Sequence, residues 1–113
     1  MKIITEVLTI NELKQMAANM FGNMVKAVVD IERELIAVDA ELHSDLEAML
    51  LENGSKQRNL WGVNFYPEAQ AEEFIEFDSI INMRPSQGNR SRGVENTEIR
   101  KKIIEIAAKR IKR

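Results

Sequence analysis

The spacing of apolar side chains predicts three helices, each with its own start or stop signals. Residues Thr9–Glu12 form a capping box, in which the threonine hydroxyl and the glutamate carboxylate each bond the other residue's backbone amide. Apolar residues then recur at intervals of three and four until Gly22, a natural left-handed stop. A second box, Ser44–Glu47, predicts a helix that ends at Gly54. A third helix follows residues 96–97, where an asparagine or a threonine can cap the first amides.

Between the helices the hydrophobic period changes to two, which is typical of strands with one face toward water. A short turn near Arg33 joins the first two of these strands. Pro67 and Pro85 end the last two, because proline cannot donate to a β-ladder. The four predicted strands span residues 26–32, 35–43, 60–66 and 73–83.

The element order is therefore αββαββα, which predicts an α+β fold. We expect a mostly antiparallel four-stranded sheet with the helices packed on one face. The chain of 113 residues is close to the commonest size of one domain, and no linker or repeat divides it. Residues 1–113 are accordingly expected to form a single domain.

The composition narrows the class of protein. The absence of cysteine excludes disulfides, thiolate zinc sites and a cysteine nucleophile, and it fits the reducing cytoplasm, where we expect the protein to reside. No apolar run approaches the roughly 20 residues needed to span a bilayer, so no membrane association is expected. Residues 1–6 reach polar side chains too soon for a signal peptide.

Charge is divided unevenly along the chain. Residues 1–83 carry 6 Lys/Arg and 15 Asp/Glu, whereas residues 84–113 carry 10 Lys/Arg and 3 Asp/Glu. A basic tail of this kind has two interpretations: it binds an anionic partner, or it lies against the acidic part of its own chain.

The most unusual segment is the arginine- and glycine-rich loop at residues 84–93, between the fourth strand and the third helix. Glycine permits close approach to the backbone, arginine offers forked donors for phosphate or carboxylate, and a helix start favours anions. The segment lacks the spacing of a Walker loop. The alternative is a polar loop whose arginines pair with acidic strands. The candidate ligand-binding residues are Arg84, Ser86, Gln87, Asn89, Arg90 and Arg92.

An acidic run at residues 39–45 is a second candidate site. On a strand, Asp39, Glu41 and His43 would project on one side and could hold a divalent metal, with Asp78 nearby. Such a metal could activate water, so a metal-assisted hydrolase is an alternative function. The other interpretation is a solvated sheet face, with the only histidine in a structural position beside a helix cap.

Binding of nucleic acid is not favoured. The chain has only one Trp, one Tyr and four Phe, and several of these alternate into the predicted core, so few aromatic side chains are left to stack bases. The basic side chains of the third helix lie opposite its isoleucines, as on any solvated helix face. A homo-oligomer or adaptor without catalysis, whose basic tail docks on a partner's acidic sheet, remains a third functional class.

Three sequence blocks resemble a family of small bacterial proteins of unknown function: VDAELHSDLEAMLLENGSKQ (38–57), LWGVNFYPE (60–68) and EFDSIINMRPSQGNRSRG (76–93). The resemblance covers nearly the whole chain and implies a compact, free-standing domain. It assigns no activity and leaves open whether the protein is an enzyme. The leading hypothesis from the residues is a binding module for an anionic, phosphate-bearing ligand through loop 84–93.

Overall fold

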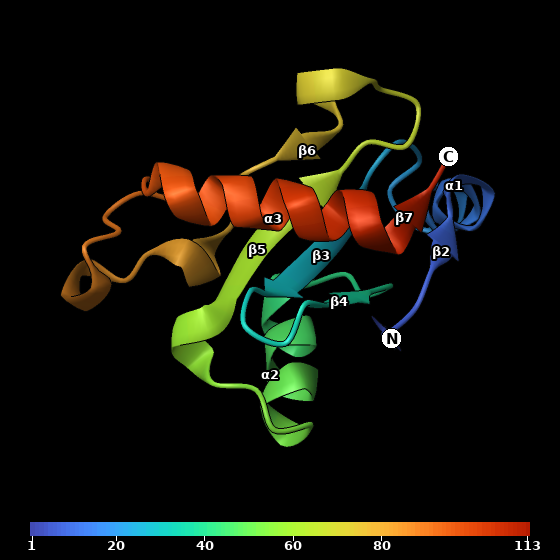
Figure 1. Ribbon diagram of the computed structural model, residues 1–113. Coiled ribbons are helices and arrows are strands. Elements are labelled where there is room, and N and C mark those ends of the chain that lie inside the picture. The colour runs from blue at the N-terminus through green and yellow to red at the C-terminus, as the bar shows by residue number, and fades with distance from the viewer.

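A five-stranded antiparallel sheet forms the centre of the computed structural model, which describes residues 1–113 (Figure 1). The strand order across this sheet is β1-β4-β3-β5-β6. Its strands are β1 (Lys2–Ile4), β3 (Val25–Asp30), β4 (Leu35–Val38), β5 (Leu60–Phe65) and β6 (Ile75–Glu76). Two further short strands, β2 (Leu8–Thr9) and β7 (Ile111–Lys112), pair in parallel and bring the two ends of the chain together.

The three predicted helices are present. They are α1 (Ile10–Asn19), α2 (His43–Glu52) and α3 (Thr97–Arg110). Four single turns of 3-10 helix complete the chain: η1 (Gln57–Asn59), η2 (Ala71–Glu73), η3 (Ile80–Asn82) and η4 (Pro85–Gln87). No helix has the length and apolar character that crossing a membrane would require.

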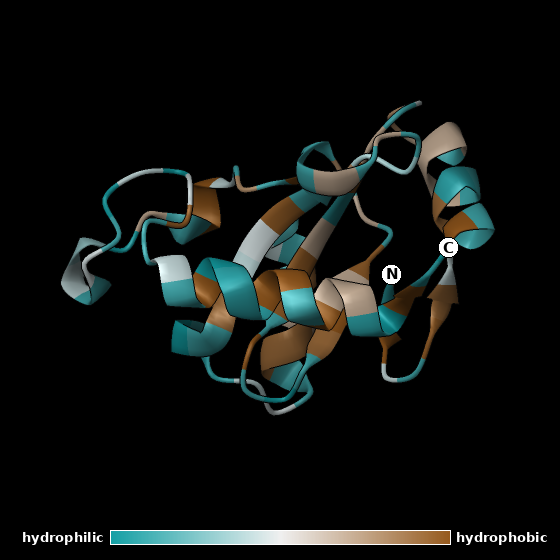
Figure 2. Ribbon diagram, turned by 45° about the horizontal axis from the view of Figure 1, so that its top comes forward, coloured by the Kyte–Doolittle hydropathy of each residue, from teal (hydrophilic) through white to brown (hydrophobic).

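The helices cover both faces of the sheet, which differs from the predicted one-sided arrangement. Helices α1 and α3 pack on the larger core cluster, whereas α2 packs on a smaller one on the opposite face. The central strands cause this division, since neighbouring residues such as Val28 and Val29 are both fully buried, on opposite faces. In Figure 2 the central strands carry hydrophobic colours, while α3 alternates between hydrophobic and hydrophilic bands.

Local capping signals are confirmed at two of the three helices. The side chain of Thr9 accepts from the Glu12 amide in a complete capping box, and the side chain of Asn96 caps α3. The box predicted at Ser44 does not form, because β4 ends at Val38 and α2 begins one residue before that serine. No side chain caps α2.

The predicted fourth strand is reduced to the two residues of β6. Beyond it, side chains satisfy the exposed edge of β5. The Asn82 side chain accepts from the Gly62 amide at 2.8 Å and donates to the Gly62 carbonyl at 2.9 Å, as a neighbouring strand would. Two residues further along the chain, the Arg84 guanidinium donates to the carbonyl of Leu60. A strand is therefore not needed at this position, and residues 80–82 form η3 instead.

The basic C-terminal part contacts the acidic part of the chain. Both Lys102 and Lys109 on α3 pair with Glu34, at 3.0 and 2.8 Å. Near the other end of the sheet, Arg92 pairs with Asp78 at 2.7 Å. Part of the uneven charge is thus compensated within the molecule.

Candidate functional site

Arg84, the first arginine of loop 84–93, is engaged by the protein itself. Its guanidinium lies 4.2 Å from the centre of the Trp61 ring and donates to the carbonyls of Gln57 and Leu60. Burial lowers the pKa of Arg84 below its ordinary value. This side chain closes a strand edge and stacks on an indole, which explains it without a ligand.

The rest of the loop is divided between structural and exposed positions. Asn89 is buried and donates to the carbonyls of Asn82 and Gly93, at 2.7 and 2.8 Å. The Gln87 side chain donates to a backbone carbonyl in η1 at 3.3 Å, whereas the side chains of Ser86 and Arg90 are exposed. The three loop arginines therefore do not converge on one point.

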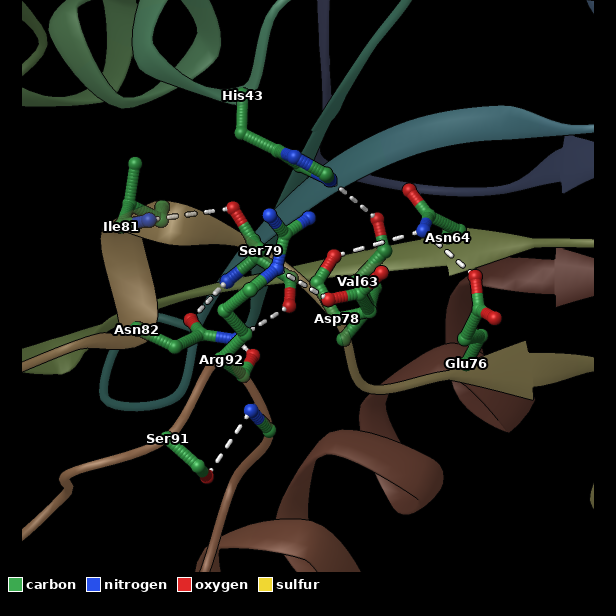
Figure 3. A network of polar contacts seen from close by, with 12 residues as sticks. His43, Val63, Asn64, Glu76, Asp78, Ser79, Ile81, Asn82, Ser91 and Arg92 are labelled. Carbon is green, nitrogen blue, oxygen red and sulfur yellow. Dashed lines mark hydrogen bonds and ion pairs between the residues drawn. The ribbon is translucent and has the colours of Figure 1, made fainter.

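Arg92 lines a pocket beside the start of α2, whereas Gln87 and Asn89 line a different hollow of about 400 Å³. The Arg92 carbonyl accepts from the Ser79 amide and from the Asn82 side chain, both at 2.9 Å, which fixes its backbone. Its Nε donates to Asp78 Oδ1 at 2.7 Å. Figure 3 shows the remaining guanidinium nitrogens pointing toward His43 on the neighbouring helix.

The pocket has a volume of about 240 Å³. It lies between β3, the start of α2, the segment 79–81 at the start of η3, and Arg92 of the loop before α3. Leucine and isoleucine side chains form its apolar rim. No carboxylate lines it. The polar lining residues are Lys26, His43, Ser44, Ser79 and Arg92. Two cations therefore line one small hollow. Lys26 takes part in none of the chain's five ion pairs, and its Nζ lies 5.2 Å from the centre of the Phe21 ring, whereas Arg92 pairs with Asp78.

His43 forms the buried wall of this pocket and is 9% exposed. Its Nε2 lies 2.8 Å from the carbonyl oxygen of Val63. Because a carbonyl can only accept, Nε2 carries the proton and Nδ1 keeps a lone pair. Burial lowers the pKa of His43 below 6.5 and outweighs the bond to Val63, which acts in the opposite direction. The ring is thus neutral at about pH 7.

The start of α2 adds polar backbone groups to the same wall. The first amides of a helix have no intrahelical acceptor, and no side chain accepts from those of His43 or Ser44. The helix dipole places partial positive charge at this end. Lys26 adds a positive charge to this end of the helix, whereas the charge of Arg92 is partly compensated by Asp78.

The metal site predicted at residues 39–45 does not form in the structure. β4 ends at Val38, and Asp39 adopts a left-handed conformation with φ of 73°, so the expected alternation along a strand is lost. Glu41 is exposed, while His43 is buried at the start of α2. No group of three or more His, Asp or Glu side chains lies close enough to hold a metal ion.

Sequence reasoning missed Lys26 and Ser79 as pocket residues and assigned Ser44 only to a cap. These residues come from β3, the segment before η3 and α2, so no local motif connects them. One signal was available: Gly62 is needed because a Cβ there would lie 2.5 Å from Ser79 Cβ. A glycine inside a strand marks such a close approach.

Other hollows offer fewer uncommitted polar groups. The largest, of about 540 Å³, lies between α3 and β6 and is mostly apolar. Its one cation, Arg100, lies 4.3 Å from the centre of the Phe77 ring. The pocket beside α2 is therefore the strongest candidate site.

Comparison with known proteins identifies one relationship. The model of the family described as "Protein of unknown function (DUF5674)" matches residues 2–110, nearly the whole chain. No curated protein and no solved structure matches. The predicted resemblance to a family of unknown function is thereby confirmed, whereas the bacterial source stays a prediction.

Proposed function

We propose that this chain, which belongs to the family of unknown function DUF5674, binds a small anionic ligand in the pocket beside the start of α2. One observation carries the proposal: two cations and an uncapped helix start surround a hollow that no carboxylate lines. An anion in this position would bond to Lys26 and Arg92 and lie at the positive end of the helix dipole. Of the ligand-binding residues predicted in loop 84–93, Arg92 is the one that lines this pocket.

The exposure of Arg92 and Lys26 to water limits the affinity that we expect for a small anion. Arg92 is about half-exposed and also pairs with Asp78, so both water and this carboxylate weaken its bond to an anion, whereas Lys26 is partly buried. Two charge-assisted bonds of this kind contribute about 4 kcal/mol in total, which corresponds to a Kd on the order of 1 mM for a bare anion. A natural ligand would add contacts to the apolar rim.

Titration of the protein with inorganic phosphate at low salt tests the proposal, by calorimetry and by NMR. His43 is the only histidine, so its ring resonances are unambiguous. An anion bound beside the ring favours the imidazolium form, so phosphate should raise the pKa of His43. The same titration in high salt should show weaker binding.

Matched variants locate the site. Lys26→Gln and Arg92→Gln should each weaken phosphate binding about thirtyfold, because each removes one charge-assisted bond of about 2 kcal/mol. Arg90→Gln is the control, since Arg90 lies on the same loop with an exposed side chain. Loss of binding in Arg90→Gln but not in Lys26→Gln would move the site to the loop. No binding by the wild type would end the proposal.

A further inference from the structure

We infer that the protein has a second binding site, separate from the anion pocket, for a free amino acid with an apolar side chain. The site is the hollow between α3 and the segment of η2 and β6, and its volume of about 540 Å³ is typical of small-ligand pockets. Figure 1 shows β6 and the yellow turn of η2 on the same side of α3. The inference follows from two unpaired charges of opposite sign in a lining that is otherwise apolar.

The walls of this hollow are mostly apolar. Its apolar lining residues are Ala71, Ile75, Phe77 and Ile104, and Ile104 is 49% exposed although it stands on a helix that packs on the core. A smaller hollow of about 220 Å³ shares Ala71, Ile75 and Ile104 with the first, so the two adjoin along α3. An apolar side chain that enters this space removes its own surface and that of Ile104 from water, which favours binding.

The two remaining lining residues carry opposite charges and come from different elements, Glu72 from η2 and Arg100 from α3. Neither takes part in any of the chain's five ion pairs. The Arg100 guanidinium lies 4.3 Å from the centre of the Phe77 ring and donates to the carbonyl of Val94 at 3.3 Å, which leaves most of its five donors free. One negative and one positive charge therefore border the hollow without a charged partner.

These two charges select the class of ligand. A carboxylate alone would be attracted by Arg100 but repelled by Glu72, and an amine alone would experience the reverse. A molecule with both groups can pair with both side chains, and an amino acid such as leucine combines them with an apolar side chain for the walls of the hollow. Both Glu72 and Arg100 are exposed, so water weakens each pairing, and each should contribute no more than about fivefold in affinity.

Titration of the wild-type protein with leucine and its analogues, followed by NMR at low salt and about pH 7, tests the inference. Leucine should bind about fivefold more tightly than 4-methylpentanoate, which lacks the ammonium group, and about fivefold more tightly than 3-methylbutylamine, which lacks the carboxylate. Glycine has both charges but no apolar side chain, so it should bind more weakly than leucine. The resonances that leucine shifts should be those of Ile75, Phe77 and Ile104, which line the hollow.

Two variants assign each charge of the ligand to its partner. Glu72→Gln should remove the preference for leucine over 4-methylpentanoate, and Arg100→Gln should remove the preference for leucine over 3-methylbutylamine. The controls are Glu73→Gln and Lys101→Gln, because these exposed residues are the chain neighbours of the two and do not line the hollow. Equal wild-type affinities for the three apolar ligands, no binding of leucine, or leucine shifts centred on the ring of His43 would each overturn the inference. Phosphate binding at the anion pocket is measured separately and does not depend on these outcomes.

Discussion

Replacing Asn82 by alanine should destabilise the protein more than any exposed asparagine replacement. Asn82 is fully buried, and its side chain satisfies both the amide and the carbonyl of Gly62. The variant leaves these two buried backbone groups without partners, at about 1–3 kcal/mol each, so the free energy of unfolding should fall by about 4 kcal/mol. For a chain of this size, that loss corresponds to a decrease in Tm of roughly 10–20 °C.

Thermal and urea unfolding, followed by the fluorescence of the only tryptophan, measures this loss. Asn19→Ala is the matched control, since Asn19 is exposed and accepts one bond from a neighbouring side chain. The control should change stability by less than about 0.5 kcal/mol. A loss below about 1 kcal/mol in Asn82→Ala would refute the idea that this amide replaces a strand. Because Asn82 also holds the Arg92 carbonyl, phosphate binding should weaken in the same variant.

Three further changes have defined outcomes. Gly62→Ala should cost about 1–3 kcal/mol in urea unfolding, because the added Cβ would lie 2.5 Å from Ser79 Cβ; an unchanged midpoint would contradict this contact. Arg84→Lys should lower Tm through loss of stacking on the indole, while phosphate affinity measured by calorimetry stays unchanged. The bonds of two lysines lower the pKa of Glu34 from 4.5 to about 2, so the stability that this carboxylate contributes is complete above pH 4.5 and is lost as the pH falls through about 2. The Tm difference between wild type and Glu34→Gln should therefore shrink in that range, and a difference that acid leaves constant would count against the ion pairs.

The features that could be predicted from the sequence are those set by neighbouring residues. The Thr9 capping box, the Asn96 cap and the left-handed Gly22 each depend on three or four consecutive residues, and each is present. The positions of β3 and β5 were also recognised, but the predicted face toward water is absent, because every residue of β5 and every residue of β3 except Lys26 is buried. The α+β class follows from these elements.

The features that escaped prediction depend on contacts between distant segments. Ser44 has the sequence of a cap, but the chain enters α2 from a strand that ends early at Val38. Arg84 has the chemistry of a ligand residue, yet a tryptophan 23 positions earlier in the chain provides its stacking surface. The second face of the sheet was overlooked because apolar residues on both sides of a strand give a continuous run that obscures the period of two.

Several hypotheses from the sequence stay predictions. A homo-oligomer or adaptor role can be tested by light scattering at low and high salt, since exposed charge pairing weakens with salt. The cytoplasmic location and any enzymatic activity also await experiment. The hydrolase hypothesis has lost its structural support, because Asp39, Glu41 and His43 do not form a cluster.

The side chains that close the edge of β5 have a consequence for the behaviour of the molecule at high concentration. An unpaired strand edge is a template on which other chains can add strands and aggregate. Here an amide and a guanidinium occupy the backbone groups of Gly62 and Leu60, so a foreign strand would find no free donors or acceptors at these positions. Asn82 and Arg84 are thus expected to protect the protein from edge-to-edge association. Their replacement would expose a strand edge on which another chain could add a strand, and it would also destabilise the fold.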